Sequence, residues 1–268
     1  MKTKENIGLE DVKKVYSGPE GDLWELIMGE QIHIGGFTSS TDLAERAGIG
    51  TGMEGVDLCC CNGAGMRFLV RFAEVDFVTG VDATERVVEQ GQKRCDAEGL
   101  SDKVRFVTRD VCDAGLDAES ADFIWGEDAW CYVKDKEKLI SEAARMVRPG
   151  GVIAFTDWLE GREGLSNEEA RRYLGFMKFP SVMDLNTYRE LLEKNGCEVL
   201  TAEYTGRFAP YMDLYLNMLG MQLTTDALRL IDFDLELMET LKNEMLFIRE
   251  LAHSGKTDQG IFIAQKKG

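Results

Sequence analysis

Short apolar runs alternate with amphipathic stretches through the middle of this chain. Each apolar run has the length of a strand, and the stretches between several of them have helical periodicity. Strands that alternate with helices of this length indicate a parallel sheet with crossover helices. The predicted strands are residues 56–61, 77–81, 104–108, 121–125 and 152–156, and the predicted helices are residues 66–73, 85–97 and 136–147.

The N-terminal flank, about fifty residues long, is polar and has helical periodicity. A glycine-rich break at Gly35-Gly36 interrupts it, and Ser40 or Thr41 is a candidate N-cap for a short helix through Arg46. We therefore expect several short helices before the first strand.

The C-terminal flank begins after residue 158, where the alternation loosens. A long Met- and Leu-rich helical stretch interrupts it, and an insertion of that length between two strands is typical of a cap over the ligand-binding end. No linker divides the chain, so we predict a single domain. The expected elements are a helix at 185–195, a strand at 198–204, helical structure at 210–252 and a last strand at 260–265. The domain, residues 1–268, is expected to consist of an N-terminal segment 1–50, a core 51–158 and a C-terminal part 159–268 with a cap at about 206–256.

The composition indicates a folded chain that does not bind nucleic acid. Of its 268 residues 44% are hydrophobic, which is enough for a full core, and no apolar run approaches the ~20 residues of a membrane span. The formal net charge of −17 argues against DNA or RNA, because phosphate binding needs a basic face. The N-terminus lacks the apolar stretch of a signal peptide. We therefore expect a cytoplasmic protein with no nucleic-acid or membrane partner.

The seven cysteines include a consecutive triplet, Cys59-Cys60-Cys61. Successive strand residues face opposite ways, so neighbours in the triplet do not readily bridge each other. No paired C-x-x-C spacing or histidine partner indicates zinc. We interpret the cysteines as small buried hydrophobes and predict no metal site.

Acidic residues stand at the ends of the predicted strands. In an open parallel sheet, ligands bind outside the carboxyl ends of the strands. Asp82 follows Gly63 at about the offset at which a carboxylate meets ribose hydroxyls in nucleotide-binding βαβ units. Asp110 ends the third strand, where the exocyclic amine of an adenine would lie, and Asp57 and Glu127 stand at two further strand ends. The pattern indicates a nucleotide-containing ligand.

The loop after the first strand departs from the dinucleotide fingerprint G-x-G-x-x-G. Its sequence, Asp57-Leu58-Cys59-Cys60-Cys61-Asn62-Gly63, resembles the methyltransferase motif D-x-G-x-G-x-G with cysteine at the first two glycine positions. Cysteine allows close backbone approach but does not easily adopt the positive φ that glycine allows. Tight packing of a cofactor on this loop is therefore not assured by the motif alone.

Further stretches extend the likeness, and the chain resembles sarcosine/dimethylglycine N-methyltransferases and, more widely, phosphoethanolamine methyltransferases. The likeness covers nearly the whole chain and is strong from about residue 16 to residue 158. The stretches are GEQIHIGGF at 29–37, RFLVR at 67–71, DFIWGEDAW at 122–130, AARMVRPGG at 143–151 and SGK at 254–256.

The resemblance implies an α/β fold: a doubly wound, mostly parallel sheet of seven strands whose last strand is antiparallel. This Rossmann-like methyltransferase fold binds S-adenosyl-L-methionine across the first four strand ends, and its N-terminal helical segment closes over the cofactor as a lid. By position, the implied cofactor-binding residues are Asp57, Cys59 and Gly63 at the methionine part, Asp82 and Ala83 at the ribose, Asp110 and Val111 at the adenine, Glu127 beside the sulfonium, and Tyr16 and Gly35 in the lid.

The implied acceptor is a small-molecule amine, for which sarcosine and dimethylglycine are the first candidates. A primary or secondary amine must lose a proton, and His33, Tyr132 and Tyr16 are the candidate catalytic residues. Tyr132 stands where the family commonly has a histidine. We expect an aromatic wall that attracts an ammonium group by cation–π interaction, and Arg207 as the partner of a substrate carboxylate. The wall consists of Trp24, Trp130, Tyr132 and Tyr211.

Two alternatives remain open at this point. The same fold and cofactor also fit methylation of another small acceptor, such as phosphoethanolamine or a thiol. A nicotinamide-dependent oxidoreductase or a cysteine-based metal or redox module needs a proper dinucleotide fingerprint or paired cysteine spacing, and the chain has neither.

Overall fold

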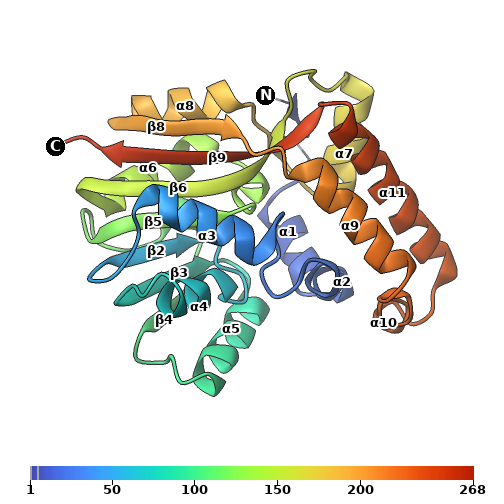
Figure 1. Ribbon diagram of the computed structural model, residues 1–268, viewed down its shortest axis with the longest axis horizontal. Helices are drawn as coiled ribbons and strands as arrows, with labels where there is room; N and C mark the ends of the chain where they lie inside the picture. Colours follow the sequence, from blue (N-terminus) through green and yellow to red (C-terminus); the bar gives the residue numbers. More distant parts are fainter. Residues whose placement is uncertain (1, 5) are drawn as a thin grey trace.

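A seven-stranded sheet forms the frame of the computed structural model, which describes residues 2–4 and 6–268 (Figure 1). The strand order is β4-β3-β2-β5-β6-β9-β8, and β9 is antiparallel to both of its neighbours. This confirms the expected fold, including the antiparallel last strand. The strands are β2 (Glu54–Leu58), β3 (Phe77–Asp82), β4 (Val104–Thr108), β5 (Ala121–Glu127), β6 (Val147–Glu160), β8 (Cys197–Tyr204) and β9 (Thr257–Lys266).

Helices cover both faces of the sheet, because alternate side chains of each strand point to opposite sides. On β5, Phe123 and Trp125 pack against one helical layer, while Ile124 packs against the other. The first layer consists of α3 (Gly36–Ala47), α4 (Ala64–Arg71) and α5 (Glu85–Ala97), and the second of α6 (Lys136–Met146) and α8 (Leu185–Lys194).

Element boundaries agree with the sequence pattern where no special backbone geometry intervenes. The predicted helix 85–97 and strand 104–108 are confirmed. β2 ends at Leu58 and not at residue 61, because the backbone turns at Cys59. α3 begins at Gly36 and not after Ser40 or Thr41.

Two further boundaries differ from the prediction. β6 begins directly after α6 and passes through the Pro-Gly-Gly stretch at 149–151, although the strand was expected only from residue 152. Helix α7 (Asn167–Met177) was not predicted, although its start carries a capping box: the Ser166 hydroxyl accepts from the backbone N–H of Glu169, and the Glu169 carboxylate accepts from that of Ser166.

A second body of helices lies beyond the carboxyl ends of the parallel strands (Figure 1). Its apolar core joins the N-terminal helix α2 to the cap helix α9, and Trp24 packs there against Phe176 at 6.3 Å between ring centroids. The sequence had led us to expect Trp24 in an aromatic wall around the acceptor, whereas it packs in this helical core. The elements are α1 (Leu9–Tyr16), α2 (Pro19–Met28), α7, α9 (Phe208–Gly220), α10 (Thr224–Leu230), α11 (Leu235–His253) and the paired strands β1 (Lys2–Thr3) and β7 (Ser181–Val182).

The helices of the described chain are too short or too polar to cross a membrane.

Candidate active site

A cavity of about 320 Å³ lies at the carboxyl ends of β2, β3, β4 and β5. The carboxylates that line it include one from each of these four strand ends: Asp57, Asp82, Asp110 and Glu127. Parallel strands bring these ends to one edge of the sheet, which is why an acid at each end gives one site. Of the other residues singled out in the sequence, the cavity lining includes Tyr16, His33, Cys59, Ala83, Val111 and Tyr132.

The cysteine loop adopts the backbone of the glycine motif that it resembles. Cys59, Cys61 and Gly63 all have positive φ, at 65°, 47° and 74°. The backbone N–H groups of Cys59 and Cys60 donate to Val81 O at 2.8 and 3.2 Å, which ties the loop to β3. The expectation that cysteine would resist this conformation is therefore wrong, and the strain of about 1–2 kcal/mol per residue is held by the surrounding structure.

We predict that single glycine substitutions at Cys59, Cys60 and Cys61 change the free energy of unfolding in alternating directions. Cys61→Gly relieves a positive φ and should raise the free energy of unfolding by about 0.5–1 kcal/mol, or the melting temperature by about 2 °C. Cys59→Gly should act in the same direction. Cys60 is buried without a positive φ, so the matched Cys60→Gly should destabilise the protein by about 1 kcal/mol. Calorimetric melting of the single variants checks this, and a loss of stability in Cys61→Gly would contradict it.

Asp82 and Asp110 are oriented by backbone N–H groups. The Asp82 carboxylate accepts from Thr84 N at 2.8 Å and from Cys61 N at 3.0 Å, and Asp110 accepts from Cys112 N at 2.9 Å. Burial raises the pKa of Asp82, and the backbone hydrogen bonds oppose that rise. The Asp82 carboxylate lines the cavity, where it can also accept from ligand hydroxyls.

Asp57 is a buried carboxylate without a hydrogen-bond donor. Its side chain is 4% exposed, and no described residue donates to it. Burial, together with the nearby carboxylates of Glu127 and Asp82, raises its pKa well above the usual range. Burying such a group without a partner is costly, so its environment fits a ligand that brings a cation or N–H donors.

Glu127 forms a polar cluster with side chains of the N-terminal segment. Its Oε1 accepts from the Ser40 hydroxyl at 2.8 Å and lies 3.3 Å from His33 Nε2, and its Oε2 accepts from Trp125 Nε1 at 3.1 Å. Burial raises the pKa of Glu127, while His33 and these hydrogen bonds lower it. The Ser40 hydroxyl donates its hydrogen bond to Glu127, so the Ser40 oxygen accepts from His33 Nε2 at 3.2 Å.

Two tyrosines from distant parts of the chain meet at the same cavity. The Tyr16 hydroxyl donates to the Tyr132 hydroxyl at 3.0 Å, and their rings meet edge to face at 5.4 Å. Tyr132 also packs edge to face on Phe179 at 4.8 Å. Burial raises the pKa of both tyrosines well above 10, so they are neutral phenols at physiological pH. They can orient a ligand by hydrogen bonds, but a phenolate base is disfavoured.

Three residues expected to bind the acceptor lie away from the cavity. Trp130 is fully buried under the sheet, stacked on Phe155 at 4.0 Å, with its Nε1 donating to Leu58 O. Arg207 forms an ion pair with Asp42 on α3. The Tyr211 hydroxyl donates to Gly35 O at 3.5 Å from α9. The side chain of each is engaged elsewhere, and none of the three is among the described residues that line the cavity.

Two glycines expected to bind the cofactor have backbone roles instead. Neither Gly35 nor Gly63 is part of the cavity lining. Gly63 is the N-cap of α4, and a Cβ there would lie 2.5 Å from the Phe106 ring. Gly35, with φ of 90°, is the N-cap of α3, and a Cβ there would lie 2.9 Å from the Ser39 Cβ. Both are needed for turns beside the site.

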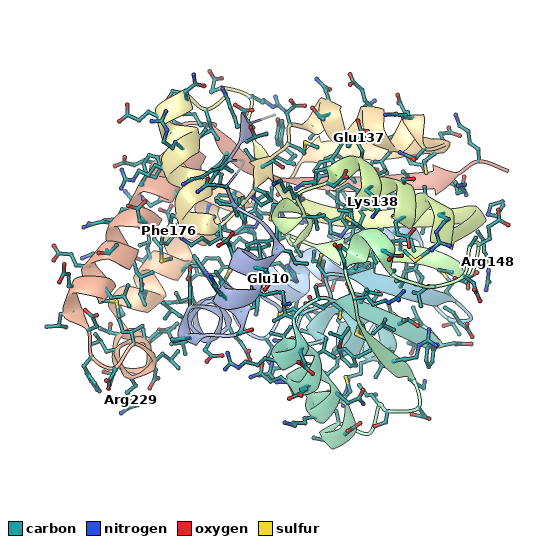
Figure 2. All side chains as sticks on the ribbon, turned by 180° about the vertical axis from the view of Figure 1, so that it is seen from behind. Glu10, Glu137, Lys138, Arg148, Phe176 and Arg229 are labelled. Atoms are coloured by element: carbon teal, nitrogen blue, oxygen red, sulfur yellow. The ribbon has the colours of Figure 1, made fainter. Side chains whose placement is uncertain are left out.

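Several lining residues were not identified from the sequence. Glu30, Gln31 and Ile32 of the lid line the cavity; they belong to a stretch that carried the family resemblance, which was the available signal. Lys134 and Lys138 also line it, without any motif to indicate them. Figure 2 shows Lys138 on α6 and Glu10 on α1, the helix whose Leu9 and Val12 line the cavity as well. The cap helices α9–α11 contribute no described residue to the lining.

Comparison with known proteins gives one family and many solved structures of the same fold. Residues 56–155 match the family described as "Methyltransferase domain". The phosphoethanolamine N-methyltransferase 1 of wheat (Triticum aestivum) is 24% identical over 244 residues, which are 91% of this chain and 48% of the wheat protein. The chain thus spans about half the length of that curated relative.

Two solved structures illustrate the likeness of fold. A putative sarcosine dimethylglycine methyltransferase from Galdieria sulphuraria has a TM-score of 0.77 at 22% identity, covering 85% of each chain. The phosphoethanolamine N-methyltransferase 2 of Haemonchus contortus, in complex with phosphomonomethylethanolamine and S-adenosylhomocysteine, has a TM-score of 0.85 at 21% identity, covering 96% of this chain and 59% of the other. At these identities the likeness establishes the fold.

Proposed function

We propose that this chain, which has the Rossmann-like methyltransferase fold and a methyltransferase domain at residues 56–155, transfers a methyl group from S-adenosylmethionine to a small amine. The observation that carries the proposal is the set of four carboxylates from consecutive strand ends around one cavity, with Asp57 buried and without a donor among the described residues. A cationic adenosine derivative supplies what these carboxylates lack: hydroxyls, an exocyclic amine, an ammonium group and a sulfonium.

The assignment of residues to the cofactor follows the order of the strand ends. Asp82 holds the ribose hydroxyls, and Asp110 with the Val111 backbone holds the adenine. Asp57 faces the ammonium of the methionine part, and Glu127 lies nearest the sulfonium. When bound, S-adenosylmethionine supplies an activated methyl group, so the protein has to align the acceptor and exclude water. Tyr16 and the lid residues at 30–33 cover the cavity and serve that second purpose.

An amine acceptor must present its lone pair, and the cluster around Glu127 can take the proton it releases. His33 lies 3.3 Å from the Glu127 carboxylate, whose pKa is raised by burial, so together they form a unit that can accept a proton. The neutral phenols of Tyr16 and Tyr132 orient the nitrogen. Among the described residues that line the cavity, the only basic side chains are His33, Lys134 and Lys138.

Two measurements on the purified protein test the proposal. Calorimetry should detect S-adenosylhomocysteine binding and no binding of NAD. Turnover should then be followed as S-adenosylhomocysteine release with glycine, sarcosine, dimethylglycine, phosphoethanolamine and simple thiols. Absence of S-adenosylhomocysteine binding would refute the cofactor, whereas turnover confined to thiols would refute only the amine acceptor.

A phosphorylated amine is the second candidate acceptor. Lys134 and Lys138 line the cavity, and an ammonium side chain attracts phosphate as a point charge. The same screen separates the two, because Lys138→Ala should impair turnover of phosphoethanolamine and leave that of an uncharged amine nearly intact.

We predict that Tyr132→Phe lowers kcat more for a secondary amine than for a tertiary amine. The change removes one hydroxyl from the Tyr16–Tyr132 pair. It should lower kcat by less than about threefold with a tertiary amine, which has no N–H for the Tyr132 hydroxyl to orient, and by about tenfold with a secondary amine, whose N–H that hydroxyl can accept. Steady-state kinetics with dimethylglycine and sarcosine gives the comparison. Equal losses with both acceptors would contradict the prediction.

A further inference from the structure

A buried clamp of side chains holds the backbone of one residue of the lid. The backbone N–H of Ile34 donates to Asp128 Oδ2 at 2.8 Å, and its carbonyl accepts from Gln259 Nε2 at 3.0 Å. Gln259 Nε2 also donates to the Asp128 carboxylate at 2.9 Å. Ile34 and Gln259 are fully buried, and Asp128 is 5% exposed. Both backbone polar groups of Ile34 are thus paired with side chains that come from β9 and from the end of β5.

The neighbouring carbonyls are held in the same way from the cap. The Tyr215 hydroxyl donates to His33 O at 3.3 Å, and the Tyr211 hydroxyl donates to Gly35 O at 3.5 Å. Three consecutive carbonyls of the lid therefore accept from side chains of α9 and β9. His33 O and Gly35 O also accept from the backbone N–H groups of Gly36 and Ser39. At Ile34 O the Gln259 side chain takes the place of such a backbone donor, which a buried carbonyl needs.

Both the amide nitrogen and the amide oxygen of Gln259 form hydrogen bonds within the clamp. Its two N–H groups point at Ile34 O and at Asp128, and its Oε1 accepts from the Thr205 hydroxyl at 3.0 Å. An amide offers two donors and a carbonyl oxygen, so all its groups are engaged and its orientation is fixed. No apolar residue of similar shape can satisfy Ile34 O and Asp128 together.

We propose that Gln259 is a positioning residue for His33, acting through the backbone of Ile34. His33 directly precedes this clamped residue, and its imidazole lies 3.3 Å from Glu127. A displacement of about 1 Å at a reacting group can lower a rate by about a hundredfold, so the clamp sets the efficiency of proton removal. The antiparallel last strand thereby contributes to catalysis although it lies outside the cavity lining. This inference rests on the proposed function of the same site.

The test compares two glutamines of the same strand. Gln265 lies at the exposed end of β9, where its Nε2 donates to Gly150 O, and Gln265→Met is the matched control. Gln259→Met should lower kcat by about tenfold or more, change the KM for S-adenosylmethionine by less than about threefold, and alter the pH profile of kcat/KM for a secondary amine. Thr205→Val, which removes the hydroxyl that orients Gln259 and with it the acceptor of Arg207 N, should lower kcat by about threefold. Gln265→Met should match the unsubstituted protein.

Amide hydrogen exchange gives a readout that does not depend on the reaction. Exchange in the peptide that contains residues 31–36 should become about tenfold faster in Gln259→Met and remain unchanged in Gln265→Met. Normal kcat and an unchanged pH profile in folded Gln259→Met or Thr205→Val would overturn the inference. If the unsubstituted protein methylates no amine, the proposed function fails; the exchange data then decide separately whether the clamp holds the lid.

Discussion

Asp82→Ala should weaken the affinity for S-adenosylhomocysteine by about a hundredfold or more. The carboxylate lines the cavity, where it can accept from the two ribose hydroxyls, and hydrogen bonds to a charged group contribute about 1.5–3 kcal/mol each. Two such bonds amount to at least about 3 kcal/mol, or roughly two powers of ten in Kd. The variant also removes the acceptor for Cys61 N and Thr84 N, so the cysteine loop should loosen as well.

Titration calorimetry measures this effect, and a residue at the opposite end of the same strand is the control. Asp76 lies immediately before β3, is exposed, and accepts only from Gly52 N at 3.2 Å. Asp76→Ala should therefore leave the affinity unchanged. If folded Asp82→Ala bound S-adenosylhomocysteine normally, the assignment of the cavity to this cofactor would be wrong.

Glu127→Gln should distinguish the charged cofactor from its neutral product. S-adenosylmethionine carries a sulfonium cation, whereas S-adenosylhomocysteine has a neutral thioether. A carboxylate about 5 Å from a cation contributes about 3 kcal/mol at an effective dielectric constant of 20, and part of this is offset by His33 beside it. We expect the amide to raise the Kd for S-adenosylmethionine by about tenfold and that for S-adenosylhomocysteine by less than threefold.

Asp57→Asn provides the contrast, because the ammonium group of the methionine part is present in both ligands. That variant should weaken both by a similar factor. The ratio of the two Kd values needs no acceptor and is insensitive to small changes in stability. If Glu127→Gln raised the Kd values of both ligands equally, the placement of Glu127 beside the sulfonium would be wrong.

Much of the sheet and the acidic edge of the site followed from local pattern. The strand at 104–108 and the helix at 85–97 coincide with the prediction, because hydrophobic periodicity reports burial of one face. The acids at strand ends converged on one cavity, since parallel strands bring their carboxyl ends to the same edge. The predicted element boundaries that were wrong lie where backbone geometry, and not the hydrophobic pattern, ends the element, as at Cys59.

Local pattern alone therefore determined the alternation of strands and helices and the line of carboxylates at the strand ends. Only the tertiary structure decided which polar and aromatic side chains reach the cavity. Arg207 could have faced a substrate carboxylate, but it pairs with Asp42, 165 positions earlier, and Gln259 holds a peptide 225 positions earlier. The physical reason is that the partner of a side chain is chosen by the packing of distant elements, which periodicity within one element does not encode.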